Sequence, residues 1–89
     1  MERKFVFDEA KSAVNKAKHG IDFVEAQAIW RDDRPLQIAG RTEAEDRFIV
    51  IGRIEGRHWS AVVTYRGDCV RLISVRRSRK QEVEAYEGE

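Results

Sequence analysis

The stretch Val70–Arg77, with the sequence VRLISVRR, combines the pattern of a short buried strand with three arginine side chains. Its apolar residues form a run too short to be a helix by itself, which favours a strand. Because side chains alternate along a strand, Leu72 and Arg76 are expected on one face and Arg77 on the other. The planar guanidinium of arginine suits phosphate oxygens. We therefore expect this strand to anchor the core and to form an anion-binding site at its rim.

The net charge of +1 hides an uneven distribution of charged residues. Eight basic residues lie between Arg53 and Lys80, against two acidic ones. The acidic residues gather instead at positions 32–33 and 43–46 and in the C-terminal tail. This separation favours a polyanionic partner for one face of the protein, and an ordinary solvated surface is the alternative.

Length and composition indicate one globular domain spanning residues 1–89. No run approaches the roughly 20 apolar residues of a membrane span, and the first residues lack the apolar core of a signal peptide. A cytoplasmic protein without membrane contact is therefore expected. Cys69 is the single cysteine and cannot form an internal disulfide, and with only two histidines beside it we expect no metal site and no cofactor.

The N-terminal part predicts a strand and two helices. Lys4–Phe7 has the pattern of a strand, Asp8 is placed to cap the helix that follows, and Gly20 fits its end. A second helix is expected to begin at Asp22, with Glu25 completing a capping box. Four small apolar residues recur at helical spacing in the first helix and predict its core-facing side: Ala10, Ala13, Val14 and Ala17.

The remainder predicts four strands and a final helix. The strands are expected at Leu36–Ala39, Arg47–Ile54, His58–Arg66 and Cys69–Arg76, and the short links between the last three favour an antiparallel meander. A capping box of Ser78 and Gln81 predicts a helix over Ser78–Tyr86. The order is β-α-α-β-β-β-β-α, which predicts an α+β fold in which an antiparallel sheet carries two N-terminal helices and one C-terminal helix.

Several separate motifs, in this order, resemble the BrnT toxin family over nearly the whole chain. The residues that carry the resemblance are Phe5–Asp8, Lys11, Asn15, Lys18–Ile21, Phe23, Glu25–Ala26, Glu45–Phe48, Gly52, Arg71–Arg77, Glu82 and Tyr86.

The resemblance implies an endoribonuclease toxin of a type II toxin–antitoxin system, with a RelE-like fold. Such a toxin arrests growth and is neutralised by a BrnA-like ribbon-helix-helix antitoxin. The resemblance also implies that the complex represses its own operon, so that operator DNA is contacted only through the antitoxin complex.

RNA can be cleaved without a metal, because its own 2′-OH can attack the adjacent phosphorus. The protein must then accept and donate protons and stabilise the charge that develops on the phosphate. Histidine changes its charge near neutral pH, so His19 is a candidate acid or base, with Glu45 as an alternative base. Lys18, Arg47 and Arg76 are candidates to hold the phosphate. Further RNA contacts are expected from Lys16, Arg71, Arg77, Arg79, Lys80 and Tyr86.

Each of these roles has a plainer alternative. Lys18 and His19 lie where cations simply stabilise a helix C-terminus, and Glu45 and Arg47 are spaced to form a surface ion pair. Tyr86 either stacks on a base or packs against the sheet. At the level of function, a non-catalytic nucleic-acid-binding module and a protein-interaction domain also remain open.

Overall fold

The computed structural model describes residues 4–40 and 46–88. Its elements are β1 (Lys4–Val6), α1 (Glu9–His19), the 3-10 helix η1 (Glu25–Arg31), β2 (Leu36–Ala39), β3 (Phe48–Ile54), β4 (Arg57–Arg66), β5 (Cys69–Arg77) and α2 (Lys80–Glu87). The predicted α+β class and element order are confirmed. None of the helices in this part of the chain has the length and apolar composition that a membrane crossing requires.

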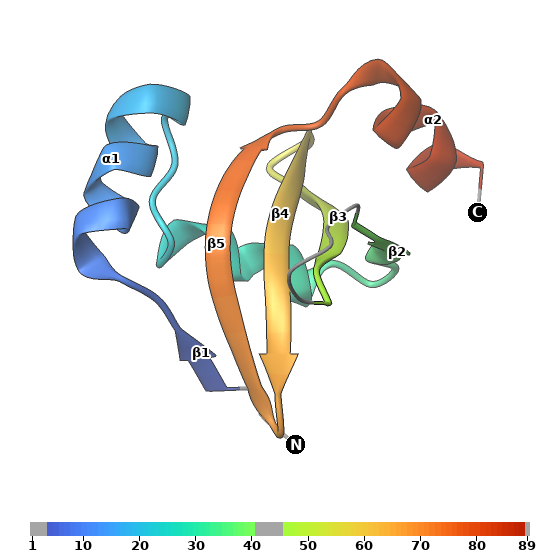
Figure 1. Ribbon diagram of the computed structural model, residues 1–89. Coiled ribbons are helices and arrows are strands. Elements are labelled where there is room, and N and C mark those ends of the chain that lie inside the picture. Colours follow the sequence, from blue (N-terminus) through green and yellow to red (C-terminus); the bar gives the residue numbers. More distant parts are fainter. Residues whose placement is uncertain (1–3, 41–45, 89) are drawn as a thin grey trace.

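The five strands form one sheet in the order β1-β5-β4-β3-β2 (Figure 1). Strands β2 to β5 form the expected antiparallel meander. Strand β1 pairs with β5 in parallel, which makes the sheet mixed rather than wholly antiparallel. A parallel partner requires a crossover connection, and the long segment between β1 and β2 supplies the helices that cover the sheet.

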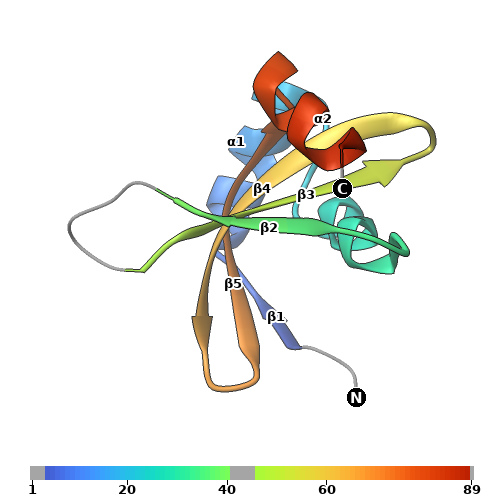
Figure 2. The ribbon, with the colours of Figure 1, turned by 90° about the vertical axis from the view of Figure 1, so that its right-hand side faces the viewer.

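The two faces of the sheet are covered by different helices. One face packs on Phe23, Ala26 and Ile29, which come from η1 and the loop before it. The other face is covered at one end by α2, where Ser60 and Ile51 are fully buried. Helix α1 lies beside β5 and α2 lies on the far side of the sheet, as the two views show (Figures 1 and 2).

A β-bulge changes which residues of β5 face the core. Val62 pairs with Ser74 but Val63 pairs with Leu72, which leaves Ile73 as an extra residue on β5. Leu72 is therefore buried on the same face as Val75, and both are almost inaccessible to solvent. The expectation that Leu72 shares a face with Arg76 was wrong, because one inserted residue reverses the alternation.

Helix α1 packs on the sheet through polar residues, so the prediction of an apolar core-facing stripe was wrong. Its buried residues are Ser12 and Asn15, and the four apolar residues of the predicted stripe are exposed. The Asn15 amide donates to the carbonyl of Val75 at 2.8 Å and accepts from its backbone N–H at 3.1 Å. It therefore pairs with β5 as a neighbouring strand would. Because these backbone groups need partners, the polar side chain faces inward.

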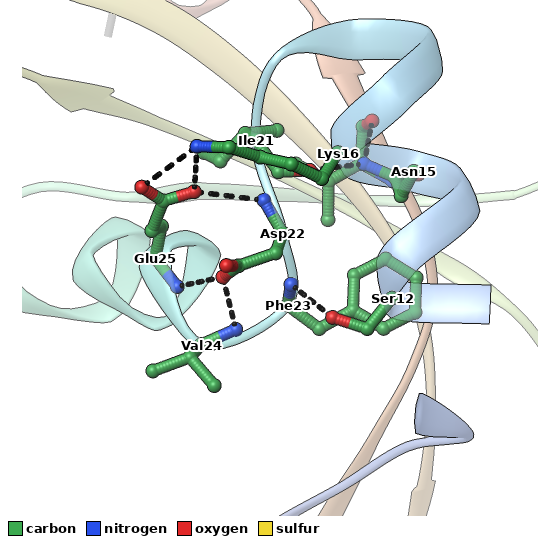
Figure 3. Close-up of polar contacts among 9 residues, drawn as sticks. Ser12, Asn15, Lys16, Ile21, Asp22, Phe23, Val24 and Glu25 are labelled. Carbon is green, nitrogen blue, oxygen red and sulfur yellow. Dashed lines mark hydrogen bonds and ion pairs between the residues drawn. The ribbon is translucent and has the colours of Figure 1, made fainter. Parts of the chain in front are cut away.

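Hydrogen bonds at the ends of α1 and of the following loop fix the path of the chain. Asp8 caps α1 by accepting from the N–H of Lys11 at 3.1 Å, and Gly20 ends the helix with a φ of 82°, as predicted. In the loop, Asp22 and Glu25 exchange hydrogen bonds, and Ser12 accepts from the N–H of Phe23 at 2.9 Å (Figure 3). These contacts hold η1 against α1.

The final helix begins later than predicted. Helix α2 starts at Lys80 with Arg79 as its N-cap residue, and Glu82 accepts from the N–H of Arg79 at 2.8 Å. The predicted capping box of Ser78 and Gln81 was therefore wrong by one position. Ser78 instead bonds the hydroxyl of Ser60 at 2.7 Å, which ties the β5–α2 connection to β4.

Gly52 on β3 is where the sheet and η1 approach most closely. A Cβ atom at this position would lie 2.9 Å from both the Cγ2 and the carbonyl oxygen of Ile29. We expect Gly52→Ala to lower the free energy of unfolding by about 1–3 kcal/mol, because Ile29 is fully buried and has no room to move. Urea denaturation monitored by tryptophan fluorescence measures this change. An unchanged midpoint would mean that the backbone of η1 shifts without cost.

Candidate functional site

Arg76 is held by an acidic partner that the sequence pattern did not predict. Its Nη1 and Nη2 atoms donate to the two carboxylate oxygens of Glu82 at 2.7 and 2.8 Å. The two side chains are only 19% and 11% exposed. The arginine at the end of the buried strand thus has the anionic partner that its burial demands.

Three donors converge on the Glu82 carboxylate and keep it ionised. The hydrogen bonds from Arg76 lower the pKa of Glu82 most, and those from the N–H of Arg79 and the hydroxyl of Ser60 lower it further. Desolvation opposes them, and the net result is a pKa of about 2. Glu82 is therefore a fixed negative charge at neutral pH and a poor general base.

One edge of the Arg76 guanidinium has no hydrogen-bond partner among the described residues. Glu82 occupies the end formed by Nη1 and Nη2, and the second Nη1 proton points to the carbonyl of Arg77 at 3.4 Å. Within residues 4–40 and 46–88, no group accepts from Nε. Nε and the second proton of Nη2 lie on one edge, and such an edge binds two oxygens of a phosphate.

A groove of about 370 Å³ separates α1 from β5, and we call it the α1–β5 groove. Ser74 contributes to its β5 side and lies two residues before Arg76 on the same strand face, a distance of about 7 Å. The last turn of α1 and the end of β5 lie at the same end of the molecule (Figure 1). Lys18 and His19 line this groove, and Arg76 lies further along β5 without being part of the lining. The groove is lined by Ala10, Lys11, Val14, Asn15, Lys18, His19, Ile73 and Ser74.

Arg47 does not join this group. Arg76 pairs with Ser60 on β4, and Ser60 pairs with Ile51 on β3. Arg47 lies four residues before Ile51 on the chain, next to the first residue of β3. Arg47 is thus displaced from Arg76 by about 13 Å along the strands and by two strands across the sheet. Glu45, the alternative base, lies outside the described residues. Arg47 and Arg76, both predicted to hold the phosphate, therefore lie apart, and the catalytic roles of Lys18, His19 and Arg76 stay predictions.

The other predicted RNA-binding cations occupy several different surfaces. Lys16 forms an ion pair with Glu25 at 2.8 Å, on the side of α1 away from the groove (Figure 3). Arg77 lies 5.5 Å from the ring centroid of Trp59, on the opposite sheet face from Arg76, as the alternation predicted. Exposed cations on β5 and at the start of α2 are Arg71, Arg79 and Lys80.

Tyr86 is engaged by a carboxylate of a distant segment. Its hydroxyl donates to Asp32 at 2.5 Å, and this hydrogen bond is the main reason that its pKa is raised to about 12. His58 lies edge-on to the Tyr86 ring and contacts Glu87 at 2.6 Å. These contacts fasten α2 to β4 and to the segment after η1. They were not predictable from spacing, because the partners of Tyr86 and His58 are far apart along the chain.

An α+β protein with cations gathered beside one strand suits a polyanionic ligand. Residues 7–82 match a model of ribonuclease toxins from type II toxin–antitoxin systems. This class of toxin acts on RNA and is paired with a cognate antitoxin. The model is that of BrnT, and because it covers most of the sequence, the chain belongs to the BrnT family. No curated protein matches the chain.

Proposed function

We propose that this toxin cleaves RNA without a metal ion, at a site formed by Lys18, His19 and Arg76. The observation that carries the proposal is the free edge of the Arg76 guanidinium, which lies close along β5 to a groove lined by a lysine and a histidine. Glu82 fixes the orientation of that edge before RNA binds. Preorganised donors of this kind lose little free energy to reorganisation when charge develops on the phosphate.

The reaction that these residues suit is attack of the RNA 2′-oxygen on the adjacent phosphorus. The new bond joins the 2′-oxygen to phosphorus, and the bond from phosphorus to the 5′-oxygen breaks. The products are a 2′,3′-cyclic phosphate and a free 5′-hydroxyl. The 2′-hydroxyl loses a proton and the 5′-oxygen gains one; His19 exchanges one of these protons and water the other, while Lys18 and Arg76 stabilise the additional negative charge.

We propose further that the cognate antitoxin is a ribbon-helix-helix protein and that the complex represses its own operon. The class of the toxin supports the presence of an antitoxin. The exposed cations of the toxin's described residues are spread over several surfaces, and we propose that operator DNA is contacted through the antitoxin. Both proteins act in the cytoplasm, where the RNA substrate of the toxin is found.

Incubation of the purified toxin with RNA in EDTA tests the catalytic proposal. We expect cleavage to persist, since the attacking hydroxyl belongs to the RNA and the stabilising charges belong to the protein. The fragments should carry 2′,3′-cyclic phosphates and 5′-hydroxyls, which enzymatic end labelling detects. His19→Ala should slow cleavage by about 100-fold or more.

Two results would contradict the proposal. Cleavage that requires added Mg²⁺ and leaves 5′-phosphates would indicate a metal-dependent hydrolysis. Intact RNA that nevertheless binds in a salt-sensitive manner would favour a non-catalytic binding module.

A further inference from the structure

We infer that the α1–β5 groove is also the docking site of the cognate antitoxin, which inserts a segment with apolar side chains flanked by carboxylates. The inference rests on the proposed function in one respect, because the same groove holds Lys18 and His19. Antitoxin binding itself is measurable whether or not RNA is cleaved.

The first observation is that α1 exposes its apolar residues. Since the helix packs through Ser12 and Asn15, the rest of its surface faces solvent, including the side that borders the groove. Val14 on that side is 61% exposed, which makes it one of the most exposed large apolar residues in the described part of the chain. An apolar helix side that no element of the toxin covers is typical of an interface.

The second observation is the shape of the groove beside Val14. Ala10 and Val14 form its wall on α1, and the bulge residue Ile73 forms the apolar part of its β5 side. Its volume of about 370 Å³ is enough for several side chains of a partner segment. The bulge matters here because Ile73 is the inserted residue. Leu72 and Val75 fill the core, and Ile73 faces the groove instead.

The third observation is the charge at the rim. Lys11, Lys18 and His19 line the groove, and none of the carboxylates in residues 4–40 and 46–88 pairs with either lysine. On the other flank of α1, by contrast, Lys16 is already paired with Glu25. Of the two flanks of α1, the one facing the groove therefore carries lysines without carboxylate partners among the described residues. Carboxylates of a partner protein would be attracted to this flank.

The lining of the groove favours a protein segment over a stretch of RNA at its apolar wall. Single-stranded RNA is usually held by several aromatic side chains on which bases stack, whereas the described lining of this groove has one aromatic ring, that of His19, and no Phe, Tyr or Trp. Apolar partner side chains would cover Val14 and Ile73, while partner carboxylates would take the places of phosphates at Lys11 and Lys18. A segment bound in this way covers His19 and excludes RNA from the site.

Binding of the full-length antitoxin to the full-length toxin, measured by calorimetry, tests the inference with Val14→Glu. The matched control is Val24→Glu, because Val24 is 64% exposed and lies on the other flank of α1. We expect Val14→Glu to weaken antitoxin binding by about tenfold or more and Val24→Glu to leave it within about threefold. Equal thermal midpoints would show that both variants fold.

A charge reversal separates antitoxin binding from RNA binding. Lys11→Glu should weaken antitoxin binding by about tenfold. Arg66→Glu makes the same change of charge at the exposed end of β4 and should leave antitoxin binding unchanged. Equal antitoxin affinity for Val14→Glu and Val24→Glu would overturn the inference. It would also be overturned if Lys11→Glu weakened RNA binding and left antitoxin binding unchanged, because the groove would then belong to RNA alone. If the wild-type toxin fails to cleave RNA but Val14→Glu still loses the antitoxin, the proposed function fails and the docking site stands.

Discussion

Arg76→Ala is expected to lower the rate of RNA cleavage by about 100-fold or more, because it removes the donors aimed at the developing charge on the phosphate. Arg76→Lys should recover only part of the loss. A lysine keeps the positive charge but cannot hold Glu82 and a phosphate on two edges of one plane. Single-turnover cleavage of a short RNA measures both variants. Arg66→Ala is the control, since this arginine is exposed at the end of β4.

The lower cleavage rate of Arg76→Ala must be distinguished from an effect of the substitution on folding. Removing Arg76 leaves the Glu82 carboxylate without its ion-pair partner in a largely buried position. The double variant Arg76→Ala/Glu82→Gln relieves this charge and should fold more stably than Arg76→Ala, while remaining equally inactive. Activity within about threefold of the wild type in Arg76→Ala would refute the role of Arg76.

Acidification from pH 6 to pH 3 is expected to lower the free energy of unfolding by about 2 kcal/mol through Glu82 alone. The pKa of Glu82 is about 2 in the folded protein, against 4.5 for a free glutamate carboxyl group. Between these values the unfolded chain binds a proton that the folded protein does not, so stability falls as the pH falls. The contribution is complete above about pH 5 and is lost by about pH 2.

Urea denaturation of the wild type and of Glu82→Gln at several pH values measures this contribution. Glu82→Gln should be less stable than the wild type at pH 6 by about 2–3 kcal/mol, because the ion pair with Arg76 is lost. The difference should shrink as the pH approaches 3. Asp32, whose pKa is also lowered, remains in both proteins, so the difference reports on Glu82. Parallel curves for the two proteins would contradict this assignment.

The strands and the order of elements could be predicted because their signals are local. The meander from β3 to β5 follows from apolar runs separated by short turns, and each of the three turns or caps at Asp8, Gly20 and Gly67 follows from residue type. The orientation of α1 could not be predicted in this way. Its apolar period is real, but Asn15 gains more by pairing with the backbone of Val75, a partner 60 residues away.

The same limit applies to the candidate site. Arg76 stood out because an arginine at the end of a buried strand needs an anion, and the sequence could not show that Glu82 already supplies one. The bulge at Ile73 is likewise invisible in the sequence, since it depends on the register between β4 and β5. What the sequence did indicate was a basic surface, since Lys11, Lys18 and His19 line one groove.

The amide of Asn15 has a consequence for how the toxin behaves at high concentration. Among residues 4–40 and 46–88, no strand neighbours β5 on its outer side beyond Arg71, and an open strand edge recruits strands of other molecules. Asn15 occupies the backbone groups of Val75 at that edge and allows α1 to close it. The Asn15 side chain thus protects this strand edge from pairing with other molecules. It also sets the distance between the helix that carries His19 and the strand that carries Arg76.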